Sequence, residues 1–189
     1  RLWYLPDPTS KPPPSGFIPQ QDKCYLLINV QRPDAASRGR TEEAMGRLER
    51  IVRQTKGVKH VVAVAGQSLL LGANSSNFGS MYVMLDDFPK RTARGMGSMA
   101  IADRLQAALQ NVIPDGLVQV FGAPPLEGLG TAGGFKIIVE DRGDSSLEEL
   151  QDVADRVVAQ GSDNAGLREL FSSFRANTPW LYLDIDRTQ

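Results

Sequence analysis

The period of the hydrophobic pattern alternates along the chain between two and about three and a half residues. Four short runs are rich in β-branched and apolar side chains, which predicts strands. These runs are residues 25–31, 58–65, 81–85 and 117–121. Residues 41–54 and 98–112 instead carry apolar side chains every three or four positions, which predicts two amphipathic helices, the first with Thr41 as its N-cap. The predicted order is strand–helix–strand, occurring twice.

This order is the split βαβ arrangement of a ferredoxin-like domain, an α+β fold with one four-stranded antiparallel sheet (βαββαβ). We expect a Pro-rich lead-in over residues 1–16, a first subdomain over 17–125 and a partial second βαβ subdomain over 126–189. The second subdomain contains one predicted helix, residues 146–160, with a capping box of Ser146 and Glu149. Its predicted strands are residues 135–140, 170–175 and 180–186. The second subdomain is therefore truncated, or is completed by sequence outside this chain.

Alternate residues of a strand point to opposite faces, so the strand residues of the first subdomain can be sorted into two sets. One set is wholly apolar and should pack under the two helices: Leu26, Ile28, Val30, Val61, Ala63, Ala65, Met81, Val83, Leu85, Val118 and Val120. The other set mixes aromatic, aliphatic, thioether and amide side chains: Tyr25, Leu27, Asn29, Gln31, His60, Val62, Val64, Ser80, Tyr82, Met84, Leu117, Gln119 and Phe121. None of these thirteen is Asp, Glu, Lys or Arg. Such a face suits either burial against a neighbouring domain or contact with an amphipathic ligand.

Residues 66–79, between the second and third predicted strands, have an unusual loop composition. Leu69, Leu70, Leu71 and Phe78 stand there among glycines and small polar residues. An ordinary loop does not expose three consecutive leucines. We expect the segment either to dock on another domain or subunit, or to form a flap that touches apolar cargo.

Charge and composition exclude several classes of function. The net charge is −1 and the basic residues are interleaved with acids, which argues against nucleic-acid binding. One cysteine and one histidine exclude a zinc site built from those ligands within this chain. No apolar run reaches the roughly 20 residues of a membrane-spanning helix.

Residues that could carry catalysis have structural explanations. His60 lies in a predicted strand without a nucleophile partner, and Cys24 at a strand start lacks a nearby base in the pattern. The glycine-rich stretch 128–134 precedes a strand rather than a helix and lacks the lysine of a phosphate loop. We therefore expect no enzymatic activity and no cofactor.

Four segments resemble a known transporter family. They are GFIPQQDKCYLLINVQRP (16–33), VVAVAGQSLLLGANSSNFGSMYVMLDDF (61–88), FGAPPLEGLGTAGGFKIIVED (121–141) and FSSFRANTPWLYLDIDR (171–187). In this order they resemble the C-terminal porter region of RND (resistance–nodulation–division) multidrug efflux pumps of the AcrB-like type. The segment 61–88 looks like the switch-loop region of that family.

The resemblance implies a periplasmic portion of a Gram-negative inner-membrane protein that works as a homotrimer. It further implies small amphipathic drugs or other hydrophobic substrates, a periplasmic adaptor and an outer-membrane channel as partners. Proton flow through the membrane part would drive transport, and no proton-relay residue lies in this chain. Drug would enter a cleft between the two subdomains and pass the switch loop to a deep pocket.

Carried over by resemblance, the substrate-binding positions fall into two groups. The drug-entrance cleft would contain Leu27, Asn29, Gln31, Phe121, Thr131 and Arg175. The deep pocket and switch loop would contain Val62, Val64, Gln67, Leu69 and Tyr82. Drug exporters of the family often carry phenylalanines in the switch loop, whereas Gln67 and Leu69 stand here, so aromatic stacking on cargo should be weaker. Arg175 could pair with an acid or gate anionic groups.

Two other functions fit a ferredoxin-like fold. The first is a stand-alone regulatory, ligand-binding or RNA-binding domain, although RNA-binding versions place basic residues beside sheet aromatics, and this mixed face has none. The second is an acylphosphatase-like hydrolase, which needs an anion-binding loop at the start of a helix, and the sequence shows no such loop.

Overall fold

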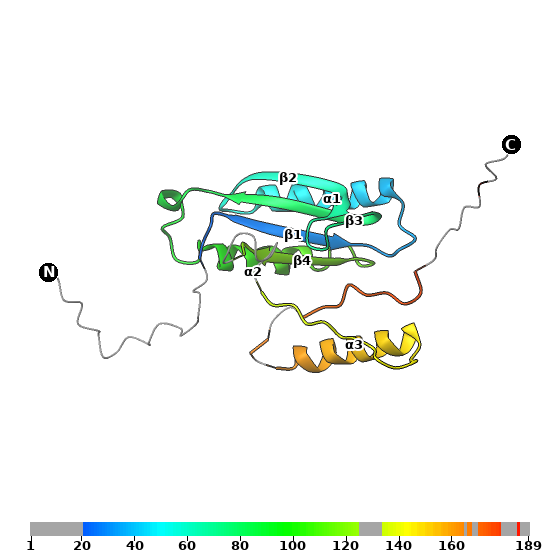
Figure 1. Cartoon of the computed structure of the whole chain (residues 1–189). Helices are drawn as coiled ribbons and strands as arrows, with labels where there is room; N and C mark the ends of the chain where they lie inside the picture. Colours follow the sequence, from blue (N-terminus) through cyan, green and yellow to red (C-terminus); the bar gives the residue numbers. More distant parts are fainter. Residues whose placement is uncertain (1–20, 125–133, 165, 168–169, 179–184, 186–189) are drawn as a thin grey trace, which may run out of the picture.

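The computed structural model describes residues 21–124, 134–164, 166, 167, 170–178 and 185. Figure 1 labels the strands and α-helices and colours them from blue at the N-terminus to red at the C-terminus. In chain order, the elements are β1 (Tyr25–Gln31), α1 (Arg38–Gln54), β2 (Val58–Ser68), β3 (Ala73–Leu85), the 3-10 turn η1 (Phe88–Lys90), α2 (Ser98–Leu109), β4 (Leu117–Gly122) and α3 (Leu147–Ser162).

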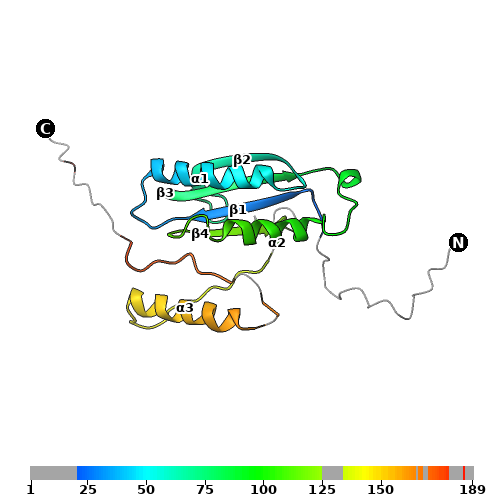
Figure 2. The same cartoon turned by 180° about the vertical axis from the view of Figure 1, so that it is seen from behind.

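The four strands form one antiparallel sheet in the order β2-β3-β1-β4. Helices α1 and α2 both lie on one face of this sheet, as the two opposite views show (Figures 1 and 2). The order and the single helical layer confirm the predicted ferredoxin-like fold. We call residues 21–124 the sheet unit, its helix-free side the open face, and residues 134–178 the α3 segment.

The core of the sheet unit lies between the helices and the predicted apolar set. Leu48 and Val52 of α1 and Ile101 and Leu105 of α2 are fully buried against the strands. Full burial of a side chain of this size contributes roughly 1.5–3 kcal/mol. The set predicted from parity is confirmed, with Ala65 only partly buried, except at Ala63 of the edge strand β2, which is exposed.

Helix α1 begins three residues before the predicted N-cap. Ser37 is the N-cap, and its hydroxyl accepts a hydrogen bond from the backbone N–H of Arg40. Thr41 is instead fully buried, and its hydroxyl lies 2.7 Å from the carbonyl oxygen of Ser76 in β3. The prediction of Thr41 as the cap was therefore wrong, because this hydroxyl ties α1 to the sheet.

The segment 66–79 is a β-hairpin and not the loop that we expected. β2 continues to Ser68 and β3 begins at Ala73, so only residues 69–72 turn. The register shifts beside Gly66, whose φ of +92° suits glycine and allows a bulge. Composition suggested a loop because glycines and small polar residues interrupt the strand pattern, but here they produce an irregular ladder.

The α3 segment keeps its predicted helix but not its predicted strands. Ser146 caps α3 and forms the predicted capping box with Glu149. Residues 135–140 and 170–175 form no strand, because neither pairs with a neighbouring strand within the described part of the chain. Residues 135–140 are also exposed. The predicted strand 180–186 lies outside the described residues apart from Ile185.

Candidate substrate-binding surface

The open face of the sheet unit divides into a covered part and an exposed part. Leu27, Asn29 and Gln31 of the central strand β1 are at least 92% buried. Val62 and Tyr82 of the β2–β3 pair, which face each other in the register, are 49% and 39% exposed. The residues of the predicted uncharged face therefore fall into two groups, one buried and one exposed to solvent.

The tip of the β2–β3 hairpin (residues 68–72) covers the middle of the open face. The hydroxyl of Ser68 donates to Oδ1 of Asn29 at 2.7 Å. The backbone N–H of Leu69 donates to the hydroxyl of Ser80 at 2.9 Å, and that hydroxyl donates to the carbonyl oxygen of Gln67 at 3.0 Å. These bonds hold the tip over β1 and β3.

A small cavity lies beneath the hairpin tip. It has a volume of about 10 Å³, which is room for about one water molecule. Its walls combine apolar and neutral polar side chains: Leu27, Ile28, Asn29, Leu69, Leu70, Ser80 and Phe121. Four predicted site residues thus meet there, but the space is closed to a drug-sized molecule.

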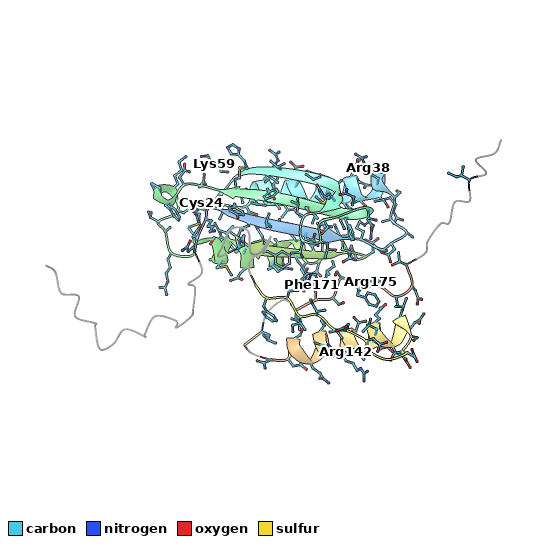
Figure 3. The ribbon with its side chains drawn as sticks, in the orientation of Figure 1. Cys24, Arg38, Lys59, Arg142, Phe171 and Arg175 are labelled. Carbon is cyan, nitrogen blue, oxygen red and sulfur yellow. The ribbon has the colours of Figure 1, made fainter. Side chains whose placement is uncertain are left out.

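Phe121 connects the open face to the α3 segment. Its ring centroid lies 5.9 Å from that of Phe171, in a tilted arrangement. Figure 3 labels Phe171 and Arg175 on the stretch of chain that follows α3 and lies in space between β4 and α3. Further along this stretch, the hydroxyl of Thr178 donates to a carboxylate oxygen of Asp34 at 3.1 Å. Residues 171–178 therefore lie along one edge of the sheet unit.

A wider cleft of about 450 Å³ opens where β1 ends and β4 begins. It is lined by Gln31, Arg32, Pro33, Pro114, Asp115, Gly116, Leu117 and Arg175. Arg32 donates to Asp115 at 2.5 Å, and this bond lowers the pKa of the Asp115 carboxyl below its ordinary value. Arg175 is exposed and donates to its own neighbour, the carbonyl oxygen of Phe174.

The predicted site residues therefore do not form one pocket. Gln31 and Arg175 line the cleft, while Leu27, Asn29, Leu69 and Phe121 line the closed cavity. The other four described positions belong to the β2–β3 ladder, where Val62 pairs with Tyr82, Val64 with Ser80 and Gln67 with Asn74. Thr131 lies outside the described residues.

Sequence reasoning missed several residues that shape this surface. Ser68 fixes the hairpin tip, and Phe171 packs on Phe121. Strand parity could have selected Ser80, which it placed on the open face. No sequence signal predicts Phe171, because its contact joins parts of the chain 50 residues apart and depends on the path of the α3 segment.

A buried ion pair links the chain just before β1 to the start of α2. Arg91, whose side chain is 1% exposed, donates twice to Asp22, and its Nη2 also lies 3.2 Å from the Cys24 sulfur. Asp22 also accepts the backbone N–H of Ser98 at the start of α2, and these bonds, chiefly that of Arg91, lower its pKa to about 2. Among the described residues, no three His, Cys, Asp or Glu side chains gather as a metal site would require.

A comparison with protein families shows to which family the chain belongs. The AcrB/AcrD/AcrF family matches residues 12–189, which is nearly the whole sequence. The chain belongs to the AcrB/AcrD/AcrF family. The resemblance to RND efflux transporters noted in the sequence is thereby confirmed.

Individual relatives of this AcrB/AcrD/AcrF family segment are distant. The toluene efflux pump membrane transporter TtgE of Pseudomonas putida is 26% identical over 175 residues, which is 92% of this chain and 16% of TtgE. The multidrug export protein AcrF of Escherichia coli is 24% identical over 177 residues, which is 92% of this chain and 17% of AcrF. The chain thus spans about a sixth of the length of these relatives.

TtgE is a membrane transporter by name, and AcrF is a multidrug export protein by name. Across the described ranges, none of the helices has the length and apolar character needed to cross a bilayer. The family relationship directs attention to the surfaces of the sheet unit, and above all to its open face and its cleft.

Proposed function

We propose that this chain is a periplasmic porter segment of a proton-driven RND multidrug efflux transporter, and that it forms the drug-entrance cleft and the switch loop. The observation that carries the proposal is the uncharged open face with an apolar hairpin tip folded over it. The wider cleft at the edge of the same sheet provides the entrance, and residues 66–79 provide the switch loop.

The chemistry of the open face suits transient contact with apolar molecules. Each 100 Å² of apolar ligand surface removed from water contributes about 2.5 kcal/mol, without any need for charge pairing. The exposed side chains of Val62, Tyr82 and Met84 offer such a surface next to the closed cavity. Binding of this kind is broad in specificity and readily reversible, as export requires.

The position of the hairpin tip supports its role as a gate. The tip separates the closed cavity from solvent and is held by side-chain hydrogen bonds of Ser68 and Ser80. A net contribution of about 1 kcal/mol for each such bond is small enough to exchange for contacts with cargo. In the assembled pump, with its adaptor and outer-membrane channel, proton-driven conformational changes elsewhere in the trimer would move the tip away from the cavity and back.

The test uses the full transporter that carries this segment, in cells lacking other pumps. We expect Tyr82→Ala and Phe121→Ala to slow the export of bulky fluorescent dyes severalfold at equal expression. Met99→Ala is the matched control, because Met99 is 45% exposed on α2, on the helix side of the sheet. Unchanged dye export in both open-face variants, with each protein present at normal level, would contradict the proposal.

A further inference from the structure

A row of three polar side chains crosses the middle of the uncharged open face. Ser80 of β3, Asn29 of β1 and Gln119 of β4 are direct neighbours in the register of the sheet. All three are at least 95% buried, so these polar groups must find partners within the protein or in a bound molecule.

Two members of the row are engaged by the hairpin tip, and the third has an atom without a partner. The Ser80 hydroxyl bonds to Gln67 and Leu69 of the hairpin, and the side-chain oxygen Oδ1 of Asn29 accepts the hydroxyl of Ser68. The side-chain oxygen Oε1 of Gln119 is fully buried and receives no hydrogen bond from the residues that the structure describes. A buried acceptor without a donor is destabilising, because it has lost its water and gained nothing in exchange.

The closed cavity is lined by two residues that lie next to Gln119 on the open face. Its lining includes Asn29, which lies opposite Gln119, and Phe121, which follows two positions later on the same face of β4. The cavity holds no more than a water-sized body while the tip is down. Displacement of Leu69 and Leu70 from its wall would enlarge it next to Asn29 and Phe121, both neighbours of Gln119 on the open face.

We propose that Gln119 selects substrates through its unpaired side-chain oxygen, which accepts a hydrogen bond from a largely apolar, uncharged molecule bearing an O–H or N–H donor. The inference deepens the proposed function and rests on it. An anion would place its charge beside the partial negative charge of Oε1, on a face with no Lys or Arg among its thirteen positions to compensate its desolvation. Permanent cations find no carboxylate among the thirteen open-face positions to compensate their desolvation.

The experiment compares two fluorescent ligands that differ in one donor. N-phenyl-1-naphthylamine carries an N–H, and its N-methyl derivative does not. With the purified full transporter, we expect the N–H compound to bind about 3–10-fold more tightly, the ratio for one net neutral hydrogen bond. In Gln119→Met the ratio should fall to near one, because methionine keeps the length of the side chain and removes the acceptor.

Gln110→Met is the matched control, since Gln110 is exposed at the end of α2, and it should keep the preference for the N–H compound. Thermal unfolding supplies a second readout. Gln119→Met and Gln119→Leu should be as stable as the parent, because no protein donor is lost. Marked destabilisation of both variants would assign Gln119 a structural partner and overturn the inference.

Equal affinity of the parent protein for both ligands, or a preference that persists in Gln119→Met, would also overturn the role of Gln119. If export of both dyes continues in either case, the proposed function stands without it. If the parent transporter neither binds nor exports either dye, both the inference and the proposed function fail.

Discussion

Two helices of this protein have similar sequence patterns but differ in how deeply their apolar side chains are buried. α1 of the sheet unit and α3 each carry one apolar stripe at helical spacing. In α1, Ala44, Leu48 and Val52 are completely buried against the sheet. In α3 no residue is buried, and Leu147, Val153 and Val157 are 58%, 38% and 37% exposed.

The difference shows that an apolar stripe determines what a helix can bury but does not supply the surface that it packs on. α1 has a sheet beside it, because four strands pair through backbone hydrogen bonds and present an apolar face. The α3 segment forms no strand ladder within the described residues, so its helix is stabilised chiefly by local interactions such as the capping box.

Truncation of one leucine in each helix tests this comparison, and it is expected to give the largest change in the free energy of unfolding. Leu48→Ala should lower the free energy of unfolding by about 2–5 kcal/mol, because it leaves a cavity in the core. Leu147→Ala should lower it by less than about 0.5 kcal/mol, because that side chain is 58% exposed. Urea unfolding of this chain measures both values, and losses of similar size would contradict the contrast.

The buried ion pair of the sheet unit gives a smaller effect that depends on pH. The pKa of Asp22 is lowered from 3.8 to about 2 in the folded protein, which corresponds to about 2 kcal/mol of stability. Because the folded-state pKa is the lower one, this contribution is complete above about pH 4 and is lost as the pH falls towards 2.

Asp22→Asn should therefore be less stable than the parent at pH 6 and approach it at pH 2. Unfolding monitored at several pH values provides the measurement. An unchanged difference between the two proteins over this range would show that Asp22 contributes through its shape and not through its charge.

The smallest predicted effect concerns the α3 segment alone. Ser146→Ala removes the hydroxyl that accepts the backbone N–H of Glu149 and should destabilise α3 by about 1 kcal/mol. Amide hydrogen exchange should become faster in α3 and stay unchanged in the sheet unit. Faster exchange in β1 or α1 would mean that the two regions are more strongly coupled than their contacts indicate.

Much of the sheet unit could be predicted from the sequence because local pattern and tertiary packing agree there. Period-two alternation placed Ile28 and Val83 in the core and Tyr82 on the open face, as observed. The candidate site was predicted less completely. Parity placed Leu27, Asn29 and Phe121 on one face, but it could not show that the hairpin tip covers them.

The remaining misses have one physical cause. Whether residues 135–140 become a strand depends on a neighbouring strand for their N–H and C=O groups, and sequence pattern carries no information about that neighbour. The same holds for residues 66–79, where pairing across the hairpin extended both strands through a composition typical of loops.

By itself, the sequence determined which side chains are apolar, how they are spaced and therefore which faces of the strands and helices seek burial. It also determined the absence of charge from the open face. Only the tertiary structure decided which of those faces found a partner, that Ser68 and Ser80 hold the hairpin tip down, and that Gln119 keeps an unpaired oxygen. The reason is that periodicity is a property of neighbouring residues, whereas burial and hydrogen bonding depend on contacts between residues far apart in the chain.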